Sequence, residues 1–284
     1  MSTLVFATLA SAIAAPERHV DRAELAPEAQ LQALCQLLSA STGLNVMAEL
    51  LSSTERLVQG FEEGLFSLAW APPLVALELQ QRRLAEPLVV VQRGQRLGYH
   101  AALFSRASSR FKQASELVGS RVAWVSHDST SGYVAPRWHL RTLGMNPDEM
   151  FAEQRFYGDH DAVVRAVLEG EADVGATHVG VDPLTGQLES APWLSYVGAE
   201  AVRVWFLIGP IPGDVVVCGA EVRPTVRQRL AAVFLALPPE ARPLAEAVFQ
   251  AHQFDPAPPG HLDLLRGLSR SRGPSGSQRP PTST

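Results

Sequence analysis

The chain has 284 residues, of which 46% are hydrophobic and 19% charged, and its net charge is −5. This composition supports one large domain or two of ordinary size and excludes a chain that is disordered throughout. The last sixteen residues contain three arginines and no acid, so the remainder has a net charge of −8. An acidic body argues against a nucleic-acid partner, because binding to a phosphate backbone requires clustered Lys and Arg.

The first apolar segment, residues 4–15, has two interpretations. It resembles the core of a signal peptide and ends in Ala14-Ala15-Pro16, but no Lys or Arg precedes it. We therefore favour a first strand over Leu4–Leu9, with a cytoplasmic protein as the consequence if Met1 is the native start. The sequence contains no other stretch that is long and apolar enough to span a membrane.

Strands and helices are predicted to alternate along the rest of the chain. Pro27 and Gly43 frame a helix over 27–42, since Pro favours the first helical turn and Gly the residue after the last. Short apolar strands between helices favour an α/β fold with parallel pairing. Further helices are expected over 53–63, 161–168 and 224–236, in a segment that begins at Pro72, and in a segment that ends near Leu143. One strand is expected to begin at residue 44. The other expected strands cover 66–70, 87–91, 99–104, 121–126, 151–156, 172–176, 202–208 and 215–218.

Three regions are predicted to lack regular structure or to form turns. A turn is expected near Gly94, and another at Asn146-Pro147. After residue 268 the composition changes to Ser, Pro, Gly and Arg, so residues 269–284 are predicted to be a disordered tail.

The strongest functional signal follows the expected strand 121–126. Three consecutive hydroxyl residues, Ser129, Thr130 and Ser131, lie where a helix begins, and Gly132 lets the backbone approach a ligand. Unpaired N–H groups at a helix start and side-chain hydroxyls together form a cradle for a tetrahedral oxyanion. The alternative is that one of these hydroxyls only caps the helix.

Two further strand ends carry candidate ligand groups. His160 follows Gly158-Asp159, with Asp161 as the expected helix cap, and Thr177-His178 follows the strand 172–176. Ligands of α/β sheets bind beyond the carboxyl ends of the strands, so we expect these segments to converge with the hydroxyl cluster. For a single His, a structural hydrogen bond is the simpler explanation.

Enzymatic and metal-binding motifs are missing from the sequence. It contains no nucleophile elbow, phosphate loop, His-Glu-x-x-His, dinucleotide fingerprint or C-x-x-C pair. Ser126, His127 and Asp128 are triad residue types, but sequence neighbours rarely adopt triad geometry. We therefore expect no enzyme, no cofactor and no metal. Cys35 and Cys218 are expected to be buried, and whether they pair is left open.

Several segments together resemble the phosphonate-binding family of periplasmic solute-binding proteins, over about residues 4–265. The resemblance is densest between 118 and 180. The segments that carry it are Val122-Ala123-Trp124-Val125, Ser129-Thr130-Ser131-Gly132-Tyr133 with Pro136, Gly144, Asn146-Pro147-Asp148, Phe156-Tyr157-Gly158-Asp159-His160-Asp161-Ala162, residues 166–176, and Gly209-Pro210-Ile211-Pro212.

The resemblance implies a type 2 periplasmic-binding-protein fold: two α/β lobes with a ligand cleft between them. Lobe one would contain 1–98 and 203–268, and lobe two 99–202. Ser129, Thr130, Ser131 and His160 would hold a small phosphorus oxyanion (phosphonate, phosphite or phosphate), and an ABC transporter membrane subunit would be the partner of a monomer. The alternative function is a cytoplasmic sensor or partner-binding module with the same fold.

Two positions depart from the family pattern as we read it. Thr54 stands where family members often have Tyr at the start of the second helix, and His178 stands where many have an acid. Both remain predicted ligand-binding residues. An acid at position 178 would suit the ammonium group of an aminoalkylphosphonate, so His178 favours a ligand without an amine.

Overall fold

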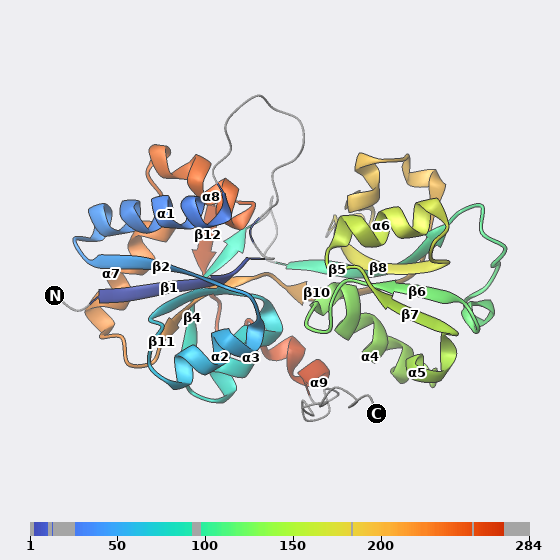
Figure 1. Cartoon of the computed structure of the whole chain (residues 1–284), viewed down its shortest axis with the longest axis horizontal. Coiled ribbons are helices and arrows are strands. Elements are labelled where there is room, and N and C mark those ends of the chain that lie inside the picture. Colours follow the sequence, from blue (N-terminus) through green and yellow to red (C-terminus); the bar gives the residue numbers. More distant parts are fainter. Residues whose placement is uncertain are drawn as a thin grey trace, which may run out of the picture.

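The chain forms two lobes, each built on its own β-sheet (Figure 1). The computed structural model describes residues 3–10, 13, 26–92, 98–182, 184–251 and 253–269. The chain passes from the first sheet to the second between β4 (Ala85–Gln92) and β5 (Gly98–Arg106), and returns between β10 (Val202–Pro212) and β11 (Val215–Gly219). This arrangement confirms the predicted two-lobed α/β class.

The first sheet has six strands and carries the N-terminal segment near one edge. Residues 3–9 form β1, so the predicted strand is confirmed and extends by one residue at its start. In spatial order the sheet contains β12 (Gln253–Pro256), β4, β11, β3 (Leu68–Ala71), β1 (Thr3–Leu9) and β2 (Asn45–Leu51).

Helices cover both faces of the first sheet. On one face, Phe6 and Phe249 stack with ring centroids 6.2 Å apart, within a core that also holds the ring of Trp70. This face is covered by α1 (Pro27–Thr42), α7 (Pro224–Leu235) and α8 (Arg242–Phe249), and the other by α2 (Thr54–Glu62), α3 (Pro73–Gln81) and the short α9 (Arg266–Ser269) (Figure 1).

The second sheet has β10 at one edge and β7 (Glu153–Phe156) at the other. Its spatial order is β10, β5, β8 (Val174–Val181), β6 (Arg121–Trp124) and β7, with β9 (Leu188–Ser190) paired to β8. One face packs against α6 (His160–Glu169), and the opposite face against α4 (Ala135–Thr142) and α5 (Pro147–Met150) (Figure 1). Gly175 lets α6 approach β8 closely, because a Cβ there would lie 2.8 Å from Val167.

Several predicted details are wrong. Pairing is mixed rather than parallel, since β11 runs antiparallel to β3 and β4, and β5 runs antiparallel to β8 and β10. The strand predicted over 172–176 instead covers Val174–Val181, because β5 and β9 continue its ladder. The strand predicted over 202–208 continues to Pro212. The predicted turn after Asn146 begins α5, and neither α8 nor β12 was predicted.

The lobe boundaries remain a prediction at the two crossing strands. β10 begins at the predicted boundary and hydrogen-bonds to β5 in the second sheet, while its far end leads into the first sheet. The predicted turn at Gly94 lies outside the described residues, as does the predicted tail except for Ser269, the last residue of α9. Cys35 and Cys218 are buried free thiols, and burial raises the pKa of Cys35 to about 12.

Candidate functional site

The hydroxyl cluster lies in the loop that connects β6 to α4. Ser129 is the cap of the following turn, because its Oγ accepts a hydrogen bond of 3.0 Å from the backbone N–H of Gly132. Thr130 and Ser131 are only 4% and 3% exposed, and they begin a π-helical turn over Thr130–Val134 that leads directly into α4. π-turns are rare and often occur at functional sites.

Thr130 has a buried polar atom that the described chain leaves unpaired. None of the described residues provides a hydrogen-bond partner for its Oγ1. An unmade hydrogen bond of a buried hydroxyl costs about 1–3 kcal/mol. A ligand oxygen that accepts a hydrogen bond from this hydroxyl would remove that cost, which would favour ligand binding at the loop.

Gly132 determines the tight shape of the hydroxyl loop. A Cβ at this residue would lie 2.3 Å from Cγ2 of Val125 and 2.7 Å from Oγ of Ser129. The backbone N–H of Val125 also donates to the carbonyl of Gly132, at 3.2 Å. The absence of a side chain therefore lets the loop fold back onto the end of β6 with its hydroxyls close to the backbone.

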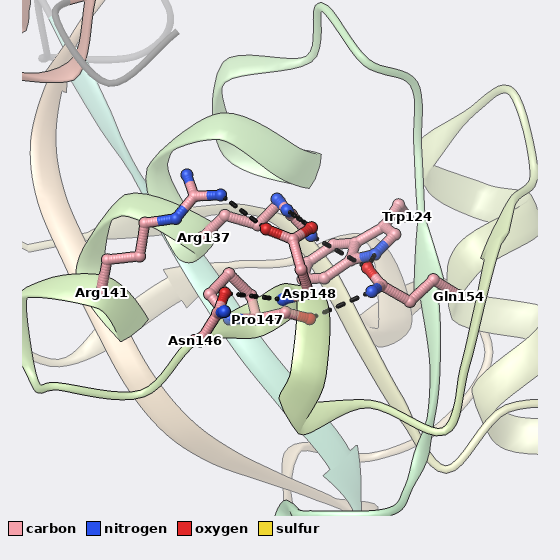
Figure 2. Close-up of polar contacts among 7 residues, drawn as sticks. All are labelled: Trp124, Arg137, Arg141, Asn146, Pro147, Asp148 and Gln154. Carbon is pink, nitrogen blue, oxygen red and sulfur yellow. Dashed lines mark hydrogen bonds and ion pairs between the residues drawn. The ribbon is translucent and has the colours of Figure 1, made fainter. Parts of the chain in front are cut away.

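A paired polar network (Figure 2) lies next to the π-helical turn, where Arg137 and Trp124 both contact the ring of Tyr133. The guanidinium of Arg137 on α4 binds Asp148 and donates to Oε1 of Gln154 on β7, at 2.9 Å. The same oxygen accepts from Nε1 of Trp124 on β6, also at 2.9 Å. Asp148 receives a second hydrogen bond of 2.9 Å from Arg141. Its hydrogen bond with Arg137 is the largest cause that lowers the pKa of Asp148.

The two predicted histidines lie against each other at the start of α6. Their ring centroids are 4.5 Å apart, and Nδ1 of His160 lies 2.9 Å from Oγ1 of the fully buried Thr177. Burial, and then the neighbouring His178, lower the pKa of His160 well below its usual 6.5. The cap of α6 is Asp159, which accepts from the N–H of Ala162, so the predicted cap at Asp161 is wrong.

The histidine pair and the hydroxyl loop belong to one region of the second lobe. The π-helical turn packs against both β8 and β5. His178 lies within β8, not beyond its end as predicted, and its side chain is exposed. The hydroxyl loop and the histidine pair therefore both lie against β8.

Thr54 joins this region from the first lobe. It is the first residue of α2, after Ser53, whose side chain caps the helix. Its Oγ1 lies 2.7 Å from Oδ2 of Asp128, the residue directly before the hydroxyl cluster. Asp128 was not among the predicted site residues, although its place next to Ser129 is a signal that the sequence already contains.

The described residues contain neither a group of metal-ligand side chains nor a helix that could span a membrane. Within 3–10, 26–92 and the later described ranges, no three His, Cys, Asp or Glu side chains are grouped as metal ligands would be. No helix in these ranges has both the length and the apolar character of a membrane span.

Comparison with solved structures shows the same fold in several binding proteins. XAC2383 from Xanthomonas citri, bound to ATP, is 24% identical, with a TM-score of 0.75 over 96% of this chain and 98% of the other. PhnD1 from Prochlorococcus marinus, in complex with methylphosphonate, is 17% identical, with a TM-score of 0.67 over 94% and 97%. The binding protein component of a phosphonate ABC transporter from Pseudomonas aeruginosa is 17% identical, with a TM-score of 0.68 over 94% and 85%.

Residues 23–262 match the family described as the periplasmic substrate-binding protein of phosphonate ABC transporters. The match covers the second sheet and all strands of the first except β1, and it includes the hydroxyl loop, both histidines and Thr54. The expected resemblance is thereby confirmed, and the chain belongs to this family of substrate-binding proteins.

Proposed function

We propose that this protein is a solute-binding protein that clamps a small phosphorus oxyanion between its two lobes. The observation that carries the proposal is the buried Oγ1 of Thr130, which has no hydrogen-bond partner among the described residues. This hydroxyl lies at a helix start between two others, where a tetrahedral oxyanion meets several donors at once. The description of the matched family names a phosphonate, which is a ligand of this kind.

Each lobe contributes to the proposed site. Ser129, Thr130 and Ser131 would donate to the phosphorus-bound oxygens from lobe two, with His160 beside them. Thr54 would line the site from lobe one, where its hydroxyl donates to Asp128 directly before the hydroxyl cluster. Ligand would stabilise the closed arrangement only through contacts with both lobes, as in hinge-type clamps.

The proposed ligand is a phosphate, phosphite or phosphonate without an amine. Methylphosphonate and ATP, which are bound in two proteins of the same fold, both present tetrahedral phosphorus with charged oxygens. His178 provides no carboxylate for an ammonium group, so an aminoalkylphosphonate would lack a partner there.

The proposed setting is that of a transporter component. The family description implies a periplasmic location and an ABC transporter membrane subunit as partner. We infer a monomeric, non-enzymatic binding protein that uses neither cofactor nor metal and has no nucleic-acid partner. The net charge of −5 agrees with the inference that the protein has no nucleic-acid partner.

A thermal-shift panel tests the proposed ligand class. Phosphate, phosphite, methylphosphonate and ATP are each added to refolded, dialysed protein, with amino acids and sugars as the control compounds. A ligand that binds only the folded state raises the melting temperature by mass action. We expect a rise with at least one phosphorus compound; a panel in which only amino acids or sugars stabilise the protein contradicts the proposal.

A further inference from the structure

Tyr133 lies at the centre of a group of rings beside the hydroxyl loop. It is the fourth residue of the π-helical turn over Thr130–Val134. The centre of its ring lies 5.5 Å from that of Trp124, 5.2 Å from that of Phe156 and 4.8 Å from the guanidinium carbon of Arg137. These neighbours belong to β6, β7 and α4, so one side chain of the turn contacts three elements of the second lobe.

The ring of His127 joins this group from the other end of the hydroxyl cluster. Its centroid lies 5.2 Å from that of Tyr133 and 4.0 Å from that of Phe156. The hydroxyl residues, 129–131, therefore lie between two residues whose rings form an aromatic pair. This pair restricts the backbone between its members, which reduces the conformational entropy that the loop loses when a ligand binds.

The π-helical turn is an uncommon conformation that the surrounding contacts must stabilise. Its hydrogen bond runs from the backbone N–H of Val134 to the carbonyl of Ser129, five residues earlier, over 3.0 Å. If the turn relaxed to the α-helical pattern, the residues before it would rotate by about 100° around the helix axis, since 3.6 residues make one turn. That rotation would move Oγ1 of Thr130 away from its buried position.

Resting on the proposed function, we propose that Tyr133 is a positioning residue for the oxyanion site. Its ring holds the π-helical turn against the sheet, and the turn directs the hydroxyls of Thr130 and Ser131 toward the ligand. These two residues are only 4% and 3% exposed, so they have little room to readjust if the turn moves. In this scheme Tyr133 affects affinity through the hydroxyls and makes no contact with the ligand.

Calorimetric titration of Tyr133→Leu with phosphate, phosphite and methylphosphonate tests the proposal. Leu retains apolar volume but provides no planar ring for the neighbours of Tyr133. We expect affinity to fall by at least about tenfold, because displaced donors bind a ligand poorly. Tyr133→Phe keeps the ring and should stay within about threefold of wild type. An equal loss in both variants would mean that the hydroxyl of Tyr133 binds the ligand directly, which overturns the proposal.

The matched control is Phe151→Leu, which removes a ring from the same core at a position outside the turn. Phe151 is 5% exposed, and its ring centroid lies 5.7 Å from that of Trp124, on which Tyr133 also packs. We expect the free energy of unfolding to fall at least as far as in Tyr133→Leu, and affinity to stay within about twofold of wild type. A similar loss of affinity in both variants would show that binding follows core stability in general, which overturns the specific role of Tyr133.

A double-mutant cycle tests whether Tyr133 acts through Thr130. A positioning residue loses its effect once the group that it positions is gone. We expect Tyr133→Leu to cost no more than about threefold in affinity when Thr130→Val is already present, against at least about tenfold in the wild-type chain. An equal cost in both backgrounds would contradict the proposal. Amide hydrogen exchange gives a second readout, because the N–H of Val134 should exchange faster in Tyr133→Leu but not in Phe151→Leu.

The outcomes separate this inference from the proposed function. If Tyr133→Leu binds phosphorus compounds within about twofold of wild type, the role of Tyr133 is overturned while phosphorus binding stands. If that variant does not fold, Phe156→Ala removes one ring neighbour at a position that is 41% exposed and should lower affinity by about threefold; unchanged affinity there has the same meaning. Wild-type protein that binds none of phosphate, phosphite and methylphosphonate overturns the proposed function and this inference together.

Discussion

Two groups of polar residues in the second lobe, the Arg137 network and the hydroxyl loop, lie close in sequence but differ in whether their buried polar atoms have hydrogen-bond partners. The network of Arg137, Asp148 and Gln154 is paired across β6, β7, α4 and α5 (Figure 2). The hydroxyl loop before α4 leaves Oγ1 of Thr130 unpaired, although that residue is as buried as Arg137, with 4% and 6% exposed. The paired group connects elements of secondary structure, and we propose that the unpaired group binds the ligand.

This difference gives a rule for separating structural from functional polar residues in the lobe. A buried polar group with all its partners stabilises the fold, and its loss is measured in the free energy of unfolding. A buried polar group that lacks a partner adds no hydrogen bond to the fold, and for the Thr130 hydroxyl we expect the loss to be measured in ligand affinity. The predictions below test each side of this rule.

The largest effect on stability is expected from Arg137→Met. The change removes the hydrogen bond to Gln154, the ion pair with Asp148 and the contact with the ring of Tyr133, 4.8 Å away. We expect a loss of roughly 3 kcal/mol in the free energy of unfolding, the low end for a broken buried pair because Asp148 is itself exposed. Chemical denaturation measures it. The control is Arg141→Ala, which removes the exposed second partner of the Asp148 carboxylate. We expect it to lower the free energy of unfolding by no more than about 0.5 kcal/mol.

A smaller loss of stability is expected from Gly132→Ala. The new Cβ would lie 2.3 Å from Val125, so the loop must shift, at a cost of about 1–3 kcal/mol, and ligand affinity should fall with it. Gly267→Ala serves as control, since its Cβ would meet only Trp138 at 3.9 Å. Combining Gly132→Ala with Val125→Ala creates room and should restore part of the binding. Unchanged affinity in Gly132→Ala would show that the loop shape is irrelevant to the ligand.

His178→Asp is expected to act on binding rather than on folding, because its side chain is exposed. A carboxylate at this position repels a bound oxyanion, so phosphate or phosphite affinity should fall by about tenfold. An aminoalkylphosphonate should lose less, because its ammonium can pair with the new acid. Calorimetric titration of both ligands against both proteins measures the difference. Equal losses for the two ligands, or none, would place His178 outside the site.

The pH dependence of stability is expected to come partly from His160. Its pKa is lowered in the folded protein by burial and by His178, so the unfolded chain binds the proton more readily. Stability is then fully present above the ordinary pKa of 6.5 and is lost as the pH falls below it. His160→Gln should flatten this decline between about pH 6.5 and pH 5. Part of the slope should remain, because burial also lowers the pKa of His139 and of His261.

A control for that experiment is His127→Gln, at an exposed position two residues before Ser129. Denaturation curves at several pH values for the three proteins give the slopes. A His160→Gln slope equal to that of wild type would mean that His160 titrates alike in the folded and unfolded states.

The sequence allowed the class of fold and the loop to be predicted because both rest on local patterns. The run Ser129–Ser131 before a helix is visible in one dimension, and Pro27 and Gly43 mark the ends of α1 in the same way. The antiparallel course of β11 and the length of β8 depend on partners far along the chain, such as Ala101 opposite His178. No local pattern contains that information.

The site was predictable to the same extent. The hydroxyls and His160 follow strands that the sequence indicates, whereas the contact of Thr54 with Asp128 joins residues 74 positions apart. Such a contact exists only once two lobes close on each other. The cap of α6 shows the finer limit, because Asp159 and Asp161 are equally good candidates by residue type and only the backbone distinguishes them.

The most direct test of the central claim is Thr130→Val, studied by calorimetric titration with methylphosphonate and phosphate and by chemical denaturation in parallel. Because Oγ1 has no partner among the described residues, removing it should leave the free energy of unfolding unchanged or raise it by up to about 1 kcal/mol. Affinity should fall by about tenfold or more, since the ligand loses a buried donor. A variant that loses stability but keeps its affinity would contradict the claim that this hydroxyl is reserved for the ligand.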